Sequence, residues 1–212
     1  FKGKTLLLRG DINSPIDPVT KKIVNENRIS KSIPTVQAIL DKGAKLVIMA
    51  HQGDTLDYED LISLEEHAEK LGQYLGQEIK YVDDPCGPAA CETIRKLHDG
   101  EGVLLGNLRY LTEEVSTFEN AVKLKPEEME KTYLVRSLLP LCDYYVNDAF
   151  AAAHRNSPSM VAFQRLLPTA AGPLMKKEIE SLDKILENPV SPCIFVLGGA
   201  KIGCVFYDAP GT

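Results

Sequence analysis

The fold class follows from a segment near the N-terminus, Thr5-Leu6-Leu7-Leu8-Arg9-Gly10-Asp11-Ile12-Asn13. Three consecutive leucines pass directly into charged and polar residues. Short continuous apolar runs of this kind are typical of strands in parallel sheets, which are covered by helices on both faces. The segment therefore predicts a buried strand with polar side chains at its carboxyl end.

Outward from this strand, apolar runs alternate with helical patterns along most of the chain. Further strands are predicted at residues 45–50, 78–82, 102–105 and 144–147. Helices are predicted at residues 28–42, after a Ser63-Leu64-Glu65-Glu66 capping box, from Pro126 onward and at residues 174–187. This alternation predicts an α/β fold, with a parallel sheet flanked by helices on both faces in a three-layer, Rossmann-like arrangement with right-handed crossovers.

Composition limits the classes of partner. The formal net charge of −6 disfavours nucleic acid and anionic lipid. The sequence contains no run of 18 apolar residues, so we expect no membrane span and a cytoplasmic location. Five cysteines without a CxxC pair indicate reduced thiols, and they predict neither a disulfide framework nor a zinc site. His67 and His98 fall on or near predicted helices, where we expect partly exposed structural side chains.

Polar residues concentrate where the predicted strands end, and ligands of open parallel sheets bind outside those carboxyl ends. Four of the seven arginines fall there, and arginine binds phosphate and carboxylate groups in a planar fork. The pattern predicts a site for a small phosphorylated, hydroxylated acid. Taken singly, the same residues also fit an interpretation as surface ion pairs and turn residues. The set comprises Arg9, Asp11, Asn13, Arg28, His51, Asn107, Arg109, Asp148, His154 and Arg155.

A second candidate segment, Gly198-Gly199-Ala200-Lys201, follows a strand predicted at residues 193–197. It is not a Walker P-loop, because GxxxxGK[ST] occurs nowhere in the chain, and the GxGxxG pattern of dinucleotide folds is also absent. Its glycines allow a phosphate to approach the backbone closely, and Lys201 supplies a point charge. Alone, the segment is a weak indication of phosphate binding.

These segments, taken in order, resemble the phosphoglycerate kinase family. Residues 9–15 resemble its RxDxNxP segment, and Asn27-Arg28-Ile29 with Ile33-Pro34-Thr35 resembles its TRI…PT segment. The resemblance runs from Lys4 to Lys201 and is closer to archaeal than to animal members. The remaining matches are Asn107-Leu108-Arg109, Asn147-Asp148-Ala149-Phe150, Ala153-His154-Arg155 and Gly198-Gly199-Ala200-Lys201.

The resemblance implies a glycolytic phosphotransferase that moves a phosphoryl group between 1,3-bisphosphoglycerate and ADP, with a carboxyl group as acceptor. The ligand of this chain would be 3-phosphoglycerate or 1,3-bisphosphoglycerate. Mg²⁺ with ATP or ADP would bind mainly to a lobe outside the chain, and no metal ligand within it is implied. Phosphoryl transfer of this kind depends on positioning and on positive charge around an anionic transition state.

The resemblance also implies a role for each matched side chain. Asp11 and Asn13 would bind the glycerate part of the substrate, and Arg28 would stabilise the transferring phosphoryl group. The phosphate end would be held by His51, Arg109 and Arg155. Arg28 and Lys201 would be the catalytic residues, and the nucleotide phosphates would be bound by Gly198, Gly199 and Lys201.

Three parts of the chain are implied in the same way. Residues 1–172 would form the phosphoglycerate-binding N-domain, residues 173–189 an interdomain hinge helix, and residues 190–212 the start of a nucleotide-binding domain. Because a single lobe cannot hold both substrates in line and away from water, we expect this chain to be inactive alone.

One departure from the family pattern concerns the segment His51-Gln52-Gly53-Asp54. The family has an arginine where this chain has Asp54, so a negative residue replaces a positive one beside a predicted anion site. A second departure is that nearly all of the family's nucleotide-binding lobe has no counterpart in this sequence. Two alternatives to a phosphoglycerate kinase stay open. One is a non-catalytic module that binds a phosphorylated acid, and the other is a related kinase for a different phosphorylated acid.

Overall fold

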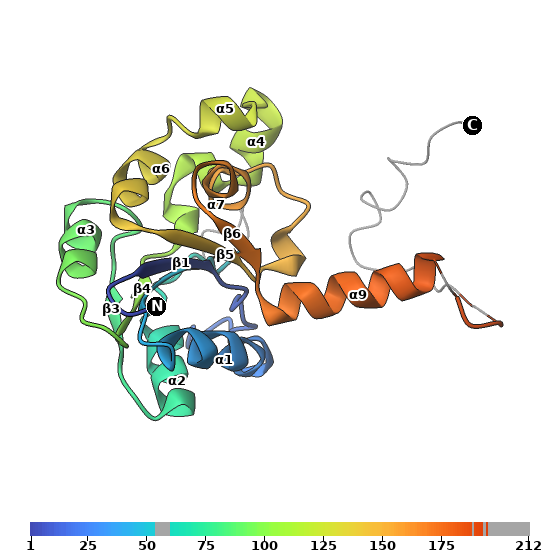
Figure 1. Ribbon diagram of the computed structural model, residues 1–212, viewed down its shortest axis with the longest axis horizontal. Helices are drawn as coiled ribbons and strands as arrows, with labels where there is room; N and C mark the ends of the chain where they lie inside the picture. The colour runs from blue at the N-terminus through green and yellow to red at the C-terminus, as the bar shows by residue number, and fades with distance from the viewer. Residues whose placement is uncertain (54–59, 188, 193, 195–212) are drawn as a thin grey trace. The chain divides into compact units, whose positions relative to one another are not determined.

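The structure is a computed structural model that describes residues 1–53, 60–187, 189–192 and 194. Contacts within the chain divide it into two units, Phe1–Glu178 and Ile179–Thr212. The first unit contains a six-stranded sheet in the order β3-β4-β2-β1-β5-β6, in which every pairing is parallel (Figure 1). Its strands are β1 (Thr5–Arg9), β2 (Lys45–Met49), β3 (Ile79–Val82), β4 (Gly102–Leu105), β5 (Tyr144–Asn147) and β6 (Thr169–Ala171).

The predicted N-terminal strand lies at the centre of this sheet, between β2 and β5. Its last residue, Arg9, is in register with Met49 on one side and Asn147 on the other, so these three strands end at the same level. All five residues of β1 are buried, as expected for a strand covered on both faces. The segments that follow these strands therefore emerge together at one edge of the sheet.

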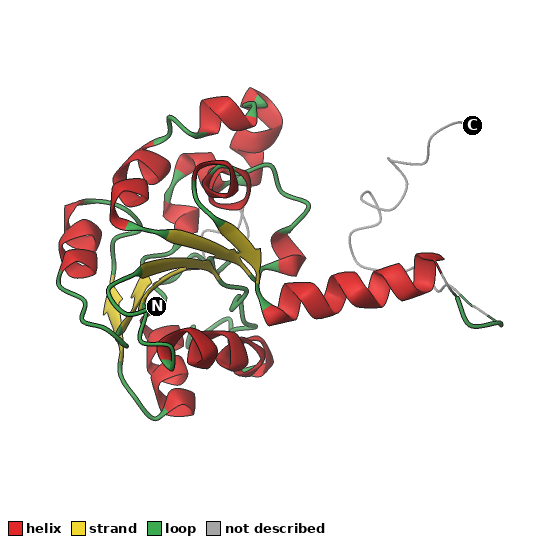
Figure 2. Ribbon diagram, in the orientation of Figure 1, coloured by secondary structure: helices red, strands yellow, loops and turns green. Residues whose placement is uncertain are grey.

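One face of the sheet is covered by α1 (Asn27–Leu40) and α2 (Glu65–Leu75) (Figure 2). Leu6 and Leu8 of β1 point to this side, where they join a buried cluster with Ile29 and Val36 of α1 and Leu71 of α2. Side chains alternate between the faces of a strand, so Leu7 belongs to the opposite cluster.

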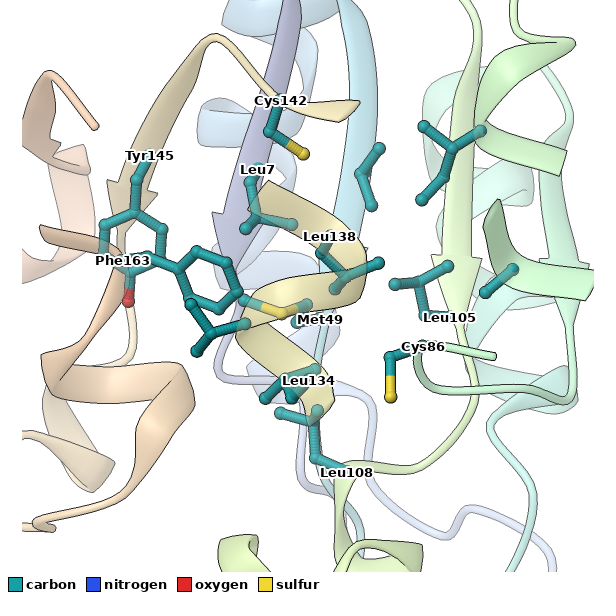
Figure 3. Packing of buried hydrophobic residues seen from close by; sticks show 14 of the residues in the cluster. Leu7, Met49, Cys86, Leu105, Leu108, Leu134, Leu138, Cys142, Tyr145 and Phe163 are labelled. Carbon is teal, nitrogen blue, oxygen red and sulfur yellow. The ribbon is translucent and has the colours of Figure 1, made fainter. Parts of the chain in front are cut away.

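The opposite face is covered by several shorter helices (Figure 1). Figure 3 shows this cluster, in which Tyr145 of β5 stacks on Phe163 with ring centroids 5.8 Å apart. Leu134 and Leu138 pack in the same cluster beside Leu7. The helices that contribute are α3 (Pro88–Arg95), α5 (Pro126–Met129), α6 (Tyr133–Leu138) and α8 (Phe163–Leu166).

The predicted fold class is confirmed, and two of the predicted helices differ from the structure. The helix expected from Pro126 is divided, because Thr132 adopts an extended conformation and α6 begins after it. The capping box at Ser63 is wrong: α2 begins after Leu64 and no side chain caps it. Leu64 is fully buried and its N–H donates to the Tyr81 hydroxyl at 3.1 Å, so a tertiary contact takes the place of the cap.

Three other features were not predicted. Helix α3 and the short strand β6 had no assignment, and His67, expected to be partly exposed, is fully buried on α2. The long helix predicted near residues 174–187 is α9 (Pro173–Glu187), and the division between the two units falls within it. The strand predicted at residues 193–197 lies outside the described residues, apart from Ile194. No helix in the described part of the chain is both long and apolar enough to cross a membrane.

Candidate anion-binding site

At the carboxyl edge of the sheet, four of the predicted site residues lie around His51, which follows β2. His51 is 9% exposed, and its pKa lies well below the ordinary value because the ring is buried and because nearby guanidinium groups disfavour its protonation. The arginines that lower the pKa of His51 come from four places: β1, the first turn of α1, the turn after β4 and the segment after β5. They are Arg9, Arg109, Arg155 and Arg28.

Arg28 and Asp11 form an ion pair at this edge. The Arg28 guanidinium donates to Asp11 Oδ1 at 2.8 Å, and the side chains are 44% and 10% exposed respectively. A pair this accessible contributes little to stability, on the order of 0–1 kcal/mol. Its consequence is geometric, because the carboxylate holds a solvent-accessible cation at the point where α1 begins. The half-buried Asn13 lies in the same loop as Asp11.

Arg109 and Arg155 share an anchor that the sequence did not indicate. Both guanidinium groups donate to the backbone carbonyl of Glu114, at 3.1 Å and 3.2 Å. Glu114 belongs to the short 3₁₀-helix η3 (Thr112–Glu114), and Arg155 also pairs with Glu119 at 3.2 Å. The two cations are thereby held next to each other, although they are far apart in the sequence.

Three strand-end loops are joined by a buried network centred on Gln52. Its side chain makes paired bonds with the backbone of Ser14, accepting from N–H at 2.8 Å and donating to the carbonyl at 2.9 Å. The Gln52 backbone N–H donates to Asn107 Oδ1 at 3.1 Å, and Asn107 Nδ2 donates to the Gln52 carbonyl at 3.0 Å. Asn107 also accepts from the N–H of Arg109 at 3.0 Å. Gln52 and Asn107 are thus structural residues that align the loops, and Asn107 was expected among the ligand contacts.

Two further residues of the predicted set face the interior. Arg9 is only 3% exposed, and its three donor groups bond to Ser159, Gly10 and His51, so it supports the site from beneath. Asp148 is buried and accepts from the Thr35 hydroxyl and from the N–H of Met175 in the first turn of α9. A carboxylate at a helix N-terminus is stabilised by the unpaired N–H groups there, which makes Asp148 a structural link between α1 and α9.

The other residues singled out in the sequence are either exposed or outside the described part of the chain. His154 is exposed near Arg155. Asp54, Gly198, Gly199 and Lys201 lie outside the described residues. No group of three or more histidine, cysteine or acidic side chains that could hold a metal ion occurs within the described ranges. Sequence patterns gave no signal for Glu114 or Ser159, because an acidic turn and a lone serine are ordinary surface features.

Fold and site together define a class: a parallel α/β protein that gathers arginines at the carboxyl edge of its sheet. The family model described as "Phosphoglycerate kinase" matches residues 1–204. The phosphoglycerate kinase of Sulfurisphaera tokodaii is 48% identical over 202 residues, which are 95% of this chain and 47% of that protein. That of Thermococcus onnurineus is 48% identical over 203 residues, again 95% of this chain and 47% of that protein.

Solved structures agree with these sequence matches. The crystal structure of phosphoglycerate kinase from Pyrococcus horikoshii OT3 matches with a TM-score of 0.87 at 44% identity, covering 96% of this chain and 48% of that one. This chain belongs to the phosphoglycerate kinase family. It corresponds to the N-terminal part and spans about half the length of the relatives it matches.

Proposed function

We propose that this chain is the phosphoglycerate-binding lobe of a phosphoglycerate kinase and binds 3-phosphoglycerate or 1,3-bisphosphoglycerate at the edge described above. The observation that carries the proposal is the convergence of four arginines on the buried imidazole of His51. These arginines outnumber the carboxylates of Asp11, Glu114 and Glu119 near them, and a net positive charge in a partly desolvated place favours an anion.

The roles proposed for single side chains follow from their exposure and partners. Arg109 and Arg155, held side by side by the Glu114 carbonyl, suit the phosphate end of the ligand together with His51. Asp11 and Asn13 suit the hydroxyl and carboxylate of the glycerate part. Arg28 is oriented by Asp11 and is accessible to solvent. These properties suit a cation that stabilises the negative charge developing on the transferring phosphoryl group.

The nucleotide half of the reaction lies beyond these residues. We propose Gly198, Gly199 and Lys201 as its contacts within this chain, Lys201 being the second catalytic cation. Members of the family use Mg²⁺ with ATP or ADP, and the described residues offer no fitting set of metal ligands. We further propose that residues 1–172 act as the binding domain, residues 173–189 as the hinge helix and residues 190–212 as the start of the nucleotide domain.

A second candidate function rests on Asp54, which stands where the family has an arginine. A carboxylate close to the ligand phosphate would weaken binding of phosphoglycerate and favour another phosphorylated acid. If Asp54 faces the phosphate, Asp54→Arg tightens 3-phosphoglycerate binding by about tenfold or more, the scale of one charge-assisted fork.

Calorimetry with the 212-residue chain tests the proposal. We expect weak binding of 3-phosphoglycerate, still weaker binding of glycerate and of inorganic phosphate, and no turnover in a coupled kinase assay. Arg109→Gln should weaken 3-phosphoglycerate binding by about tenfold or more, since a charge-assisted fork is lost. The matched control is Arg165→Gln, because Arg165 pairs with Glu127 and Glu130 on the surface.

Three results would count against the proposal. Equal affinity of the Arg109 and Arg165 variants would mean that the arginine cluster is not the site. Tighter binding of another phosphorylated acid would favour the second candidate. Measurable turnover by the chain alone would contradict its assignment as a single lobe.

A further inference from the structure

The contact between Arg9 and His51 determines which ring nitrogen of the histidine carries a proton. Arg9 Nη2 lies 2.9 Å from His51 Nδ1, and both residues are buried. A guanidinium has five donors and no acceptor, so Nδ1 must accept this hydrogen bond. An imidazole that accepts at Nδ1 is neutral and carries its single N–H at Nε2. Among the described residues, no partner of His51 Nε2 is found.

Arg9 is itself held from its other side by Ser159, on the short helix α7 (Pro158–Val161). Arg9 Nε donates to Ser159 Oγ at 3.2 Å, so the serine hydrogen is directed elsewhere. It is donated to Glu114 Oε2 at 2.6 Å, while the Ser159 N–H donates to Glu114 Oε1 at 2.7 Å. Each bond in the chain Glu114–Ser159–Arg9–His51 therefore has one defined direction.

Burial makes this chain rigid. Glu114 is 4% exposed and Ser159 fully buried, and the Tyr145 hydroxyl donates to the Ser159 carbonyl at 2.7 Å. Buried charges are tolerated only when paired and hydrogen-bonded, so the Arg9 cation and the Glu114 carboxylate depend on each other. A loss at any member leaves the next with an unsatisfied buried group.

We propose that Glu114, Ser159 and Arg9 are positioning residues that hold His51 as the neutral Nε2–H tautomer, so that it meets an anion as a hydrogen-bond donor and not as an imidazolium. The nature of the anion rests on the proposed function, whereas the tautomer does not. None of the three residues needs to touch the ligand.

The surrounding charges support this state. The groups that act on the ring are the cations Arg9, Arg109, Arg155 and Arg28, which together with burial lower its pKa. A neutral ring adds a donor to the site without adding a further desolvated positive charge. It follows that the donor persists as pH rises through neutrality, where a free imidazolium would lose its proton.

Nitrogen NMR of the histidine side chains in the 212-residue chain measures the tautomer directly and without ligand. His51 signals are assigned by their loss in a His51→Gln variant. We expect a protonated Nε2 and an unprotonated Nδ1, with no change from about pH 8 to about pH 5.5. A protonated Nδ1, or an imidazolium at about pH 6, would overturn the proposal in the wild-type protein itself.

Two variants test the chain of bonds. Arg9→Lys keeps the charge but removes the fork, and should give His51 a mixture of tautomers and a pKa shifted toward the ordinary value. Ser159→Ala leaves Arg9 in place, so we expect a smaller shift of the His51 nitrogen signals in the same direction. Arg165→Lys is the matched control on the surface and should leave them unchanged. Unaltered His51 signals in a folded Arg9→Lys or Ser159→Ala chain would overturn the positioning role.

Addition of 3-phosphoglycerate separates this inference from the proposed function. Binding should shift the Nε2–H signal without protonating Nδ1, and protonation of Nδ1 on binding would overturn the proposal that His51 meets the anion as a neutral ring. If the ligand-free tautomer is as expected and no phosphoglycerate binds, the proposed function fails while the tautomer assignment stands.

Discussion

At the scale of single residues, the candidate site contains accessible side chains, which are the proposed ligand contacts, and buried side chains that support them. Arg28 is accessible, whereas Arg9 is buried and bonded on all sides to protein groups. Both are arginines at strand-end or helix-end positions in the sequence, and only their surroundings distinguish them. The exposure of a side chain and its hydrogen-bond partners, more than its residue type, therefore distinguish a proposed ligand contact from a supporting residue.

Arg28→Ala should separate stability from catalysis. Because the Arg28 side chain is 44% exposed, its pair with Asp11 contributes on the order of 0–1 kcal/mol, and urea unfolding of this chain should change little. In an enzyme that carries both lobes, turnover should fall by at least about a hundredfold, since stabilisation of developing charge is lost. A variant with near-normal turnover and only a raised KM would contradict the assigned role.

His67 should make the fold sensitive to acid. It is fully buried, and burial lowers its pKa to about 4. Below about pH 6.5 this histidine binds a proton more readily in the unfolded chain than in the folded one. As pH drops from there to about pH 4, His67 alone therefore lowers the free energy of unfolding by about 3 kcal/mol. His67→Gln keeps a donor toward Gln52 and should remove this share of the loss in urea unfolding at the two pH values. His98→Gln, on an exposed residue, is the control, and equal acid losses in both variants would contradict the expectation.

At the scale of elements, the junction between β6 and α9 depends on close packing. A side-chain carbon at Gly172 would collide with the Asp148 carboxylate, which links the start of α9 to Thr35 of α1. The glycine is therefore needed for space, so that the carboxylate can approach the backbone. This junction is the point at which the proposed binding domain meets the proposed hinge helix.

Gly172→Ala should lower the free energy of unfolding by about 1–3 kcal/mol, the range for overpacking of a well-packed position. Gly10→Ala is the matched control, because an added carbon there would be 3.5 Å from its nearest neighbour, an ordinary contact. Urea unfolding compares the two. Similar losses in both variants would show that Asp148 is not packed against the backbone of Gly172.

At the scale of the whole molecule, the sheet of the first unit is covered on both faces by its own helices. The cluster in Figure 3 joins residues from β1, β5, α6 and α8, although α8 begins more than a hundred residues after β1 ends. Long-range apolar contacts of this kind hold the carboxyl ends of the strands in register and so fix the distances between the site loops.

Phe163→Ala should show how much this cluster contributes to the free energy of unfolding. Phe163 is fully buried against Tyr145, and its truncation should lower the free energy of unfolding by about 3–5 kcal/mol. Leu166→Ala in the same helix, at a side chain 37% exposed, should lower it by much less. Denaturant unfolding followed by circular dichroism measures both, and a loss below about 1 kcal/mol at Phe163 would contradict the packing described.

The sequence by itself determined the fold class and the edge of the sheet where the site lies. Runs such as Leu6-Leu7-Leu8 are apolar on both faces, and parallel strands end together, so the polar residues after them had to gather at one edge. Only the tertiary structure decided which of those residues are accessible at the candidate site and which are buried against other parts of the protein. Arg9, Asn107 and Asp148 resemble Arg28 and Arg109 in the sequence, yet their partners Ser159, Gln52 and Thr35 come from distant segments. Local patterns carry no information about such partners, because hydrogen bonding and burial depend on which elements pack together.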